Sequence, residues 1–232
     1  AADVDGVPTL GAPCDVPMHE AGKPVTLMEL LTNFGGMPEY LLDGGLWNEL
    51  TAHRGTGREQ RRDIVRHVLK APPPNEPGKW GYSEPGIAVA AAMLEAAADA
   101  TWETLVRERV FEPLGMEDAG FGDPDAARGH NHDGTPRAPG EGRAWPAAMD
   151  PVRAVHASLE DMARLGRALL PGSGVLEPET LGRIRAPLPP GERSDARPGF
   201  IIVALAEGPM LFAERGVDDW SARLWVMVRD SN

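Results

Sequence analysis

The chain has 232 residues, 42% of them hydrophobic and 25% charged, which is enough to bury the core of one domain or of two lobes. Its net charge of -12 argues against nucleic acid as a partner, because phosphate binding needs clustered Lys and Arg. No apolar run approaches the roughly 20 residues that a membrane span needs. The single cysteine, Cys14, excludes an intrachain disulfide.

The N-terminal part of the chain predicts a connector followed by a short helix. Residues 1–24 are rich in Pro, Gly and Asp and are expected to be extended. Thr26 and Glu29 have the spacing of a capping box, in which each side chain binds a free backbone amide of the other. A helix should therefore begin after Thr26 and run to about Asn33, where Gly35-Gly36 closes it.

Helices dominate the middle of the chain. Ser83 can cap the start of an alanine-rich helix, and Pro85 is tolerated in its first turn. Ser158 can cap another helix in the same way. Residues 120–151 are rich in Gly, Pro and Asp and are expected to be loop. The remaining helices are predicted over residues 46–53, 58–70, 102–111 and 177–185.

Short apolar, partly β-branched runs separated by turn residues lie near the C-terminus. They cover residues 200–206, 210–214 and 222–228 and predict an antiparallel meander of three strands. Helices first and strands last indicate an α+β fold.

One segment carries most of the functional information: Trp80-Gly81-Tyr82-Ser83-Glu84-Pro85-Gly86, followed by the alanine-rich helix and the stretch 110–116. Together with the stretches 25–32, 157–164 and 174–180, in that order, it resembles the serine hydrolases related to class C β-lactamases, D-Ala-D-Ala carboxypeptidases and family VIII esterases. The resemblance extends from about Pro24 to Asn232.

The resemblance implies a β-lactamase/penicillin-binding-protein-like fold, in which helices flank an antiparallel sheet and a helical lobe is inserted in the middle. We accordingly expect three regions. Residues 1–24 connect to a missing N-terminal region, residues 25–170 form the mainly helical lobe, and residues 171–232 supply a helix and strands of the sheet lobe. The N-terminal part of that lobe is expected to be missing.

The resemblance also implies roles for Tyr82 and Glu84. In this family the tyrosine of a Tyr-x-Asn triplet shuttles protons beside the nucleophilic serine, so Tyr82 is the candidate catalytic residue. Glu84 stands at the Asn position and is a candidate substrate-binding residue, although an ionised carboxylate only accepts hydrogen bonds and would repel a carboxylate-bearing β-lactam. The structural alternatives are a tyrosine packed at a helix start and an acid favoured by the helix dipole.

A third motif of the family, Lys-Thr-Gly or His-x-Gly, has its best counterpart in Glu214, Arg215 and Gly216, which are the other candidate substrate-binding residues. Arg215 could anchor an anion, but on a strand its side chain points to the opposite face from Glu214. The family's His-Thr-Ser-Gly also reads Asn-Phe-Gly-Gly at residues 33–36. These departures favour an ester, amide or D-amino-acid peptide substrate over a β-lactam.

The family's nucleophile motif, Ser-x-x-Lys, does not occur in these residues. The three lysines, Lys23, Lys70 and Lys79, follow Glu20, His67 and Glu76 by three positions. We therefore expect a chain that lacks its N-terminal catalytic portion and is inactive by itself. The alternative is a pseudoenzyme, a ligand-binding module that retains the fold without catalysis.

A metal hydrolase is a further alternative, because His130-Asn131-His132-Asp133 has ligand types that bind zinc. No remote His or Cys cluster completes this set in the sequence, so neither a metal nor another cofactor is expected. The expected partners are a small-molecule or peptide substrate. Self-association through an exposed sheet edge is also expected.

Overall fold

The computed structural model describes residues 3–4, 7–8, 22, 24–40, 44–122, 133–136, 145–170, 172–185, 196–197, 200–205, 208–217 and 220–227. The chain divides into two compact units. The first comprises Ala1–Arg107 and Arg143–Val155, and the second comprises Glu108–Gly142 and His156–Asn232. The regions 1–24, 25–170 and 171–232 expected from the sequence stay a prediction.

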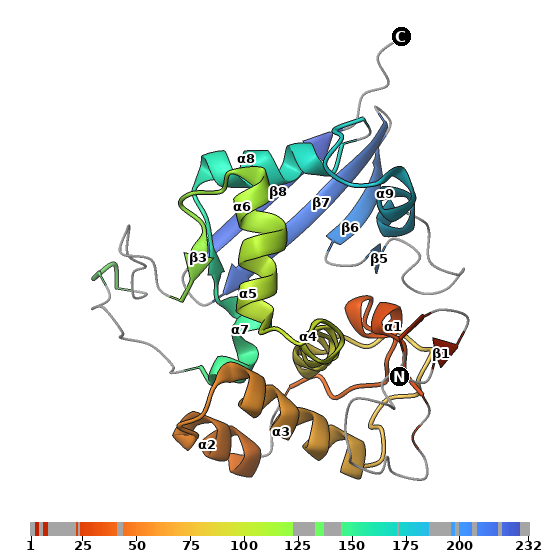
Figure 1. Ribbon diagram of the computed structural model, residues 1–232, viewed down its shortest axis with the longest axis vertical. Coiled ribbons are helices and arrows are strands. Elements are labelled where there is room, and N and C mark those ends of the chain that lie inside the picture. The colour runs from red at the N-terminus through yellow and green to blue at the C-terminus, as the bar shows by residue number, and fades with distance from the viewer. Residues whose placement is uncertain are drawn as a thin grey trace. The chain divides into compact units, whose positions relative to one another are not determined.

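The first unit is mainly helical (Figure 1). A short antiparallel pair, β1 (Asp3–Val4) and β2 (Val7–Pro8), precedes the helices. The helices are α1 (Leu27–Leu31), α2 (Gly44–Ala52), α3 (Gly57–Lys70), α4 (Glu84–Ala98), α5 (Trp102–Val106), the 3-10 turn η2 (Ala147–Met149) and α7 (Asp150–Arg153).

Local caps explain where these helices begin. The predicted capping box is present at α1, where the Glu29 carboxylate accepts the backbone amide of Thr26 at 2.7 Å. The predicted cap at α4 is also present, since the Ser83 hydroxyl accepts the amide of Gly86 at 2.9 Å. The predicted end of α1 was wrong: the helix stops at Leu31, and Asn33 adopts a left-handed φ of 64°. Asn tolerates that conformation, so Gly35-Gly36 is not needed to end the helix.

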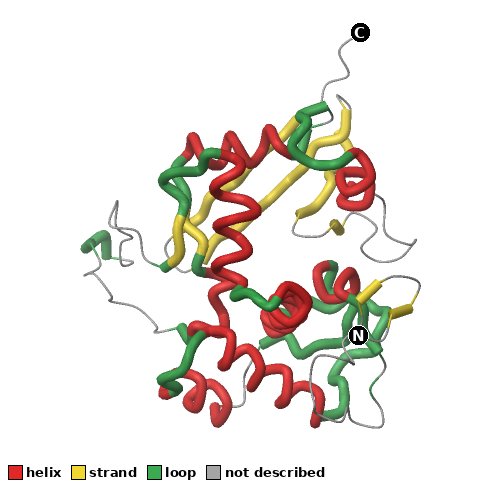
Figure 2. The backbone as a smooth tube through the Cα atoms, viewed as in Figure 1, coloured by secondary structure: helices red, strands yellow, loops and turns green. Residues whose placement is uncertain are grey.

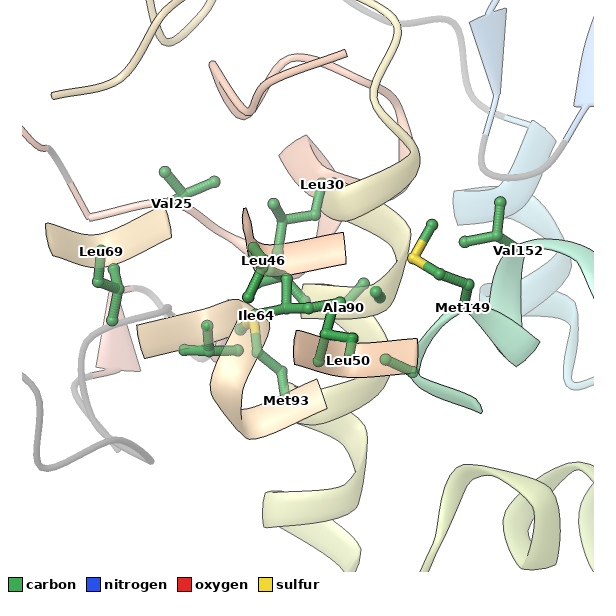
Figure 3. Close-up of a cluster of buried hydrophobic side chains, with 14 residues drawn as sticks. Val25, Leu30, Leu46, Leu50, Ile64, Leu69, Ala90, Met93, Met149 and Val152 are labelled. Atoms are coloured by element: carbon green, nitrogen blue, oxygen red, sulfur yellow. The ribbon is translucent and has the colours of Figure 1, made fainter. Parts of the chain in front are cut away.

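The core of the first unit forms around α4, which packs against α1, α3 and α7. Ala88, Val89 and Ala90 are almost completely buried, and their small side chains let the neighbouring helices approach closely. A helix with neighbours on several faces is apolar around most of its circumference, as α4 is. Figure 3 shows the cluster, whose labelled members are Val25, Leu30, Leu46, Leu50, Ile64, Leu69, Ala90, Met93, Met149 and Val152.

A buried ion network joins α3 to α4, α5 and η2. The side chain of Arg61, in α3, has no solvent exposure and donates to Glu95 of α4 at 2.6 Å and to Glu103 of α5 at 2.9 Å. It also donates to the backbone oxygen of Ala147 in η2 at 3.1 Å. Burial alone would lower the pKa of Arg61, but the hydrogen bonds and charges of the two glutamates outweigh burial and raise it.

The second unit contains the sheet. A helical stretch that begins with α5 continues through the π-helix η1 (Arg107–Phe111) and α6 (Glu112–Leu114). Two short strands, β3 (Gly120–Phe121) and β4 (Val155–His156), pair with each other. The helices α8 (Leu159–Ala168) and α9 (Pro178–Arg185) follow. The sheet contains β5 (Ala196–Arg197), β6 (Phe200–Leu205), β7 (Gly208–Val217) and β8 (Trp220–Met227) in that spatial order.

The antiparallel meander predicted for the C-terminal strands is confirmed. The strands β6, β7 and β8 pair in sequence order, and Figure 2 shows them side by side. The loop predicted for residues 120–151 was wrong in part, because this segment contains β3, η2 and the start of α7. Pro146 and Pro151 resemble helix breakers, yet proline is compatible with the first turn of a helix.

Candidate active site

Tyr82 lies directly before α4, at the end of a loop that is held by a second loop. The backbone amide of Ser83 donates to Oδ1 of Asn33 at 3.0 Å, and the Ser83 hydroxyl donates to the carbonyl of Pro38 at 2.6 Å. The amide of Glu84 donates to the carbonyl of Glu39 at 3.1 Å. The amide of Gly81 also donates to the carbonyl of Asn33, at 2.8 Å, so both neighbours of Tyr82 are fixed and its position is set by the fold.

The Tyr82 ring is 40% exposed and packs edge-on against Tyr40, which is 39% exposed, with ring centroids 6.2 Å apart. The Glu39 carboxylate, hydrogen-bonded to Tyr40, raises the pKa of that phenol. Glu84 raises it and Arg153 lowers it to a smaller extent. The exposed tyrosine pair therefore lies close to carboxylates and to the guanidinium of Arg153.

Glu84 is buried, with 4% of its surface exposed. Its Oε1 accepts the Tyr82 hydroxyl at 3.4 Å, and the same oxygen forms an ion pair with Nη2 of Arg153. The carboxylate is therefore neutralised by a neighbour rather than presented as a free negative charge. This arrangement weakens the argument that Glu84 alone would repel an anionic substrate.

Arg153 is a site residue that the sequence did not reveal. It lies in the last turn of α7, and its guanidinium carbon is 3.8 Å from the ring centroid of Trp145. Trp145 in turn packs edge-on against Trp47 of α2, with centroids 4.9 Å apart. The available signal was an arginine after Asp150-Pro151, a typical helix start, but the separation of 69 residues from Glu84 hides the pairing.

The other predicted substrate-binding residues, Glu214, Arg215 and Gly216, belong to β7 in the second unit. Their backbone partners in β8 are Arg223, Ala222 and Ser221, in that order. The side chains of this strand lie outside the described part of the structure. Their assignment to the substrate site, like that of Tyr82 and Glu84, stays a prediction.

The metal alternative gains no support from the residues that the structure describes. His130, Asn131 and His132 lie outside them, as does Cys14. The carboxylate of Asp133 instead accepts both the amide and the hydroxyl of Thr135, at 2.9 and 2.6 Å, which lowers the pKa of Asp133. Over the described ranges no three His, Cys, Asp or Glu side chains form a group that could hold a metal ion.

A cavity of about 30 Å³ lies between residues 35–38, the end of α3 and the proline-rich loop 71–77. It is lined mainly by apolar groups, and Tyr82 does not line it. The candidate site is therefore placed at Tyr82, where the family motif and the charged side chains lie. No helix within the described ranges combines the length and apolarity needed to cross a membrane.

Comparisons with known proteins support the fold that the sequence implied. A solved β-lactamase/D-alanine carboxypeptidase from Yersinia pestis superposes with a TM-score of 0.67, covering 92% of this chain and 64% of that one at 17% identity. At that identity the likeness shows the fold, and it confirms the predicted β-lactamase/penicillin-binding-protein-like architecture.

Two curated proteins are similar in sequence. "Putative penicillin-binding protein PbpX" from Bacillus subtilis (strain 168) is 24% identical over 166 residues, 68% of this chain and 38% of that protein. "Lovastatin esterase" from Penicillium rubens is 29% identical over 100 residues, 43% of this chain and 25% of that protein. The chain thus spans well under half the length of these relatives.

The family comparison covers nearly the whole chain. The family model described as Beta-lactamase matches residues 13–228, which include the Tyr82 segment, the helices of the first unit and the strands of the sheet. The resemblance inferred from the sequence motifs is therefore confirmed. The chain belongs to the beta-lactamase family.

Proposed function

We propose that this chain forms the tyrosine-bearing part of a serine hydrolase that acts by acyl transfer on an ester, amide or D-amino-acid peptide. The observation that carries the proposal is the placement of Tyr82. Its neighbours are fixed by hydrogen bonds to residues 33–39, yet its own ring is 40% exposed at the start of a buried helix. A phenol held rigidly but open to solvent can exchange a proton with a bound substrate.

The names of the relatives support this class of substrate, since they include a penicillin-binding protein, an esterase and a D-alanine carboxypeptidase. No lysine of the chain follows a serine by three positions, so the proposed nucleophile is not among these 232 residues. Loss of a nucleophile reduces the rate by about 10⁶-fold, and on this proposal the chain alone does not turn over substrate.

The test compares this chain with a longer product of the same gene that includes a Ser-x-x-Lys helix. Both are assayed with p-nitrophenyl esters and with D-Ala-D-Ala peptides. We expect hydrolysis only from the longer product, and a loss of about 10²–10⁴ in kcat for Tyr82→Phe. Arg183→Gln, at an exposed position of α9, is the matched control and should keep full activity.

The outcome that contradicts the proposal is a longer product whose Tyr82→Phe variant retains full kcat. A gene that encodes no Ser-x-x-Lys supports the second candidate, a ligand-binding module without catalysis. The observation that favours this second candidate is the pairing of Tyr82 with a carboxylate, Glu84, which stands at the family's Asn position. Calorimetric binding of a D-amino-acid peptide without turnover would identify it.

A further inference from the structure

A single oxygen atom of Glu84 connects Tyr82 to a cation on another helix. Oε1 accepts the Tyr82 hydroxyl at 3.4 Å and also pairs with Nη2 of Arg153. A carboxylate oxygen that pairs with a guanidinium is held in a fixed position and its negative charge is compensated. Replacing Arg153 therefore changes the electrostatic surroundings of the atom that accepts the Tyr82 hydrogen bond.

Arg153 is held on more than one side. Besides its ion pair with Glu84, its guanidinium carbon lies 3.8 Å from the ring centroid of Trp145. That ring is itself packed against Trp47. The planar guanidinium combines an ion pair with stacking on an aromatic face, which the ammonium group of lysine does less well. The cation is thus fixed in place.

Because this ion pair is buried, a contribution to the stability of the fold does not by itself explain why it is present. The side chains of Glu84 and Arg153 are only 5% and 17% exposed. Removing two charges from water costs free energy that their attraction often fails to recover, so apolar residues of the same size could stabilise the fold as well. In addition, Nε of Arg153 is buried without a hydrogen-bond partner among the described residues.

We propose that Arg153 is a positioning residue for Tyr82. It holds the Glu84 carboxylate in place, so that Oε1 stays in position to accept the Tyr82 hydroxyl and the phenol keeps one orientation. This inference rests on the proposed function in one respect, the assignment of Tyr82 as the proton-transferring residue. On this proposal Arg153 acts on Tyr82 through Glu84.

The test reads the tyrosine directly and needs neither substrate nor nucleophile. The chain has two tyrosines, so Tyr40→Phe leaves Tyr82 as the single phenol, and its ionisation can be followed by ultraviolet absorbance. In that background we expect Arg153→Met to raise the titration midpoint by about half a pH unit or more, because Glu84 becomes uncompensated. Glu84→Gln removes the negative charge and should lower the midpoint.

Within the described residues, the charged groups near Tyr82 and Tyr40 that contribute to the titration include Glu84, Arg153 and Glu39. Arg58→Met is the matched control, because Arg58 pairs with Asp99 at the opposite end of α4. That end lies about 22 Å from Glu84 along the helix axis. The control should leave the midpoint unchanged, and circular dichroism confirms the fold of each variant over the pH range.

An unchanged midpoint in folded Arg153→Met overturns the proposal and leaves the ion pair a structural tie between α4 and α7. If Arg153→Met does not fold, Arg153→Lys and Glu84→Gln decide together. The expected results are then a smaller rise for the lysine variant and a fall for the glutamine variant, and no shift in either overturns the proposal. Because hydrolysis is not measured, an error in the proposed function leaves these outcomes unaffected.

Discussion

At the scale of single residues, the charges of the ion network around Arg61 also affect the pKa of Asp150. Asp150, at the start of α7, has its pKa raised to about 6, first by burial and then by the negative charge of Glu103, with Arg61 opposing both. An acid whose native pKa lies above the unfolded value of about 3.9 binds more protons in the native state. The free energy of unfolding therefore falls as pH rises from about 4 to 6.

Asp150→Asn should remove this cost. We expect the variant to gain about 1 kcal/mol in the free energy of unfolding near pH 7.5, a value reduced for the water that reaches this half-buried side chain. Near pH 4 the gain should largely disappear, because Asp150 is then protonated in the native state. Chemical denaturation at both pH values measures the difference. Asp99→Asn, at an exposed position, is the control, and an equal gain at both pH values would contradict the assignment.

At the scale of elements, the Ser83 hydroxyl makes two hydrogen bonds, one that caps α4 and one to the loop that contains Pro38. It accepts the amide of Gly86 and also donates to the carbonyl of Pro38, and the residue is 3% exposed. Ser83→Ala should lose the cap, about 1 kcal/mol, and also leave the half-buried Pro38 carbonyl without its donor, about 1 kcal/mol more. Thermal and chemical unfolding measure the sum.

The control for this prediction is Thr56→Ala in the same unit. Thr56 caps α3 through its own capping box, but the residue is exposed and its hydroxyl bonds stay within the first turn. Its loss should cost about 1 kcal/mol. Equal losses for the two variants would show that the bond from Ser83 to Pro38 contributes nothing.

These caps also show which features of the fold can be predicted from the sequence. The bonds of a capping box join residues three apart, so Thr26 and Glu29 show the start of α1 without any knowledge of the fold. The meander was equally visible, because apolar β-branched runs and the turn residues between them are local signals. The family motif located Tyr82 and Glu84, although their use in catalysis stays a prediction.

Arg153 could not be found in the same way. It lies just beyond the segment 120–151 predicted as loop, in residues for which no element was predicted, and its partner Glu84 is 69 residues away. Such a pair forms only because α4 and α7 pack together, and packing depends on the apolar contacts of the whole core. Residues fixed by local bonds were predictable, whereas the charge balance beside Tyr82 required the structure.

At the scale of the whole molecule, association of copies of the chain depends on two opposing effects, pairing at a sheet edge and repulsion between the net charges. Within the described part of the sheet, β8 pairs with β7 on one side and has no strand on the other. Such an edge presents backbone groups that can pair with a second chain. The net charge of -12 opposes association, and salt screens that repulsion. We therefore expect the weight-average mass in sedimentation equilibrium to rise with protein concentration and to rise further with salt.

Two neighbouring proline substitutions in β8 can show that the edge is responsible. Along an antiparallel strand the backbone amides alternate between the partner strand and the outside. Of Ala222→Pro and Arg223→Pro, one therefore removes an outward amide and the other breaks the ladder to β7. The outward variant should be monomeric and retain a cooperative melt, whereas the other should lose stability. A parent chain that is a monodisperse monomer at high salt, or an outward variant that still associates, would show that β8 is not the contact.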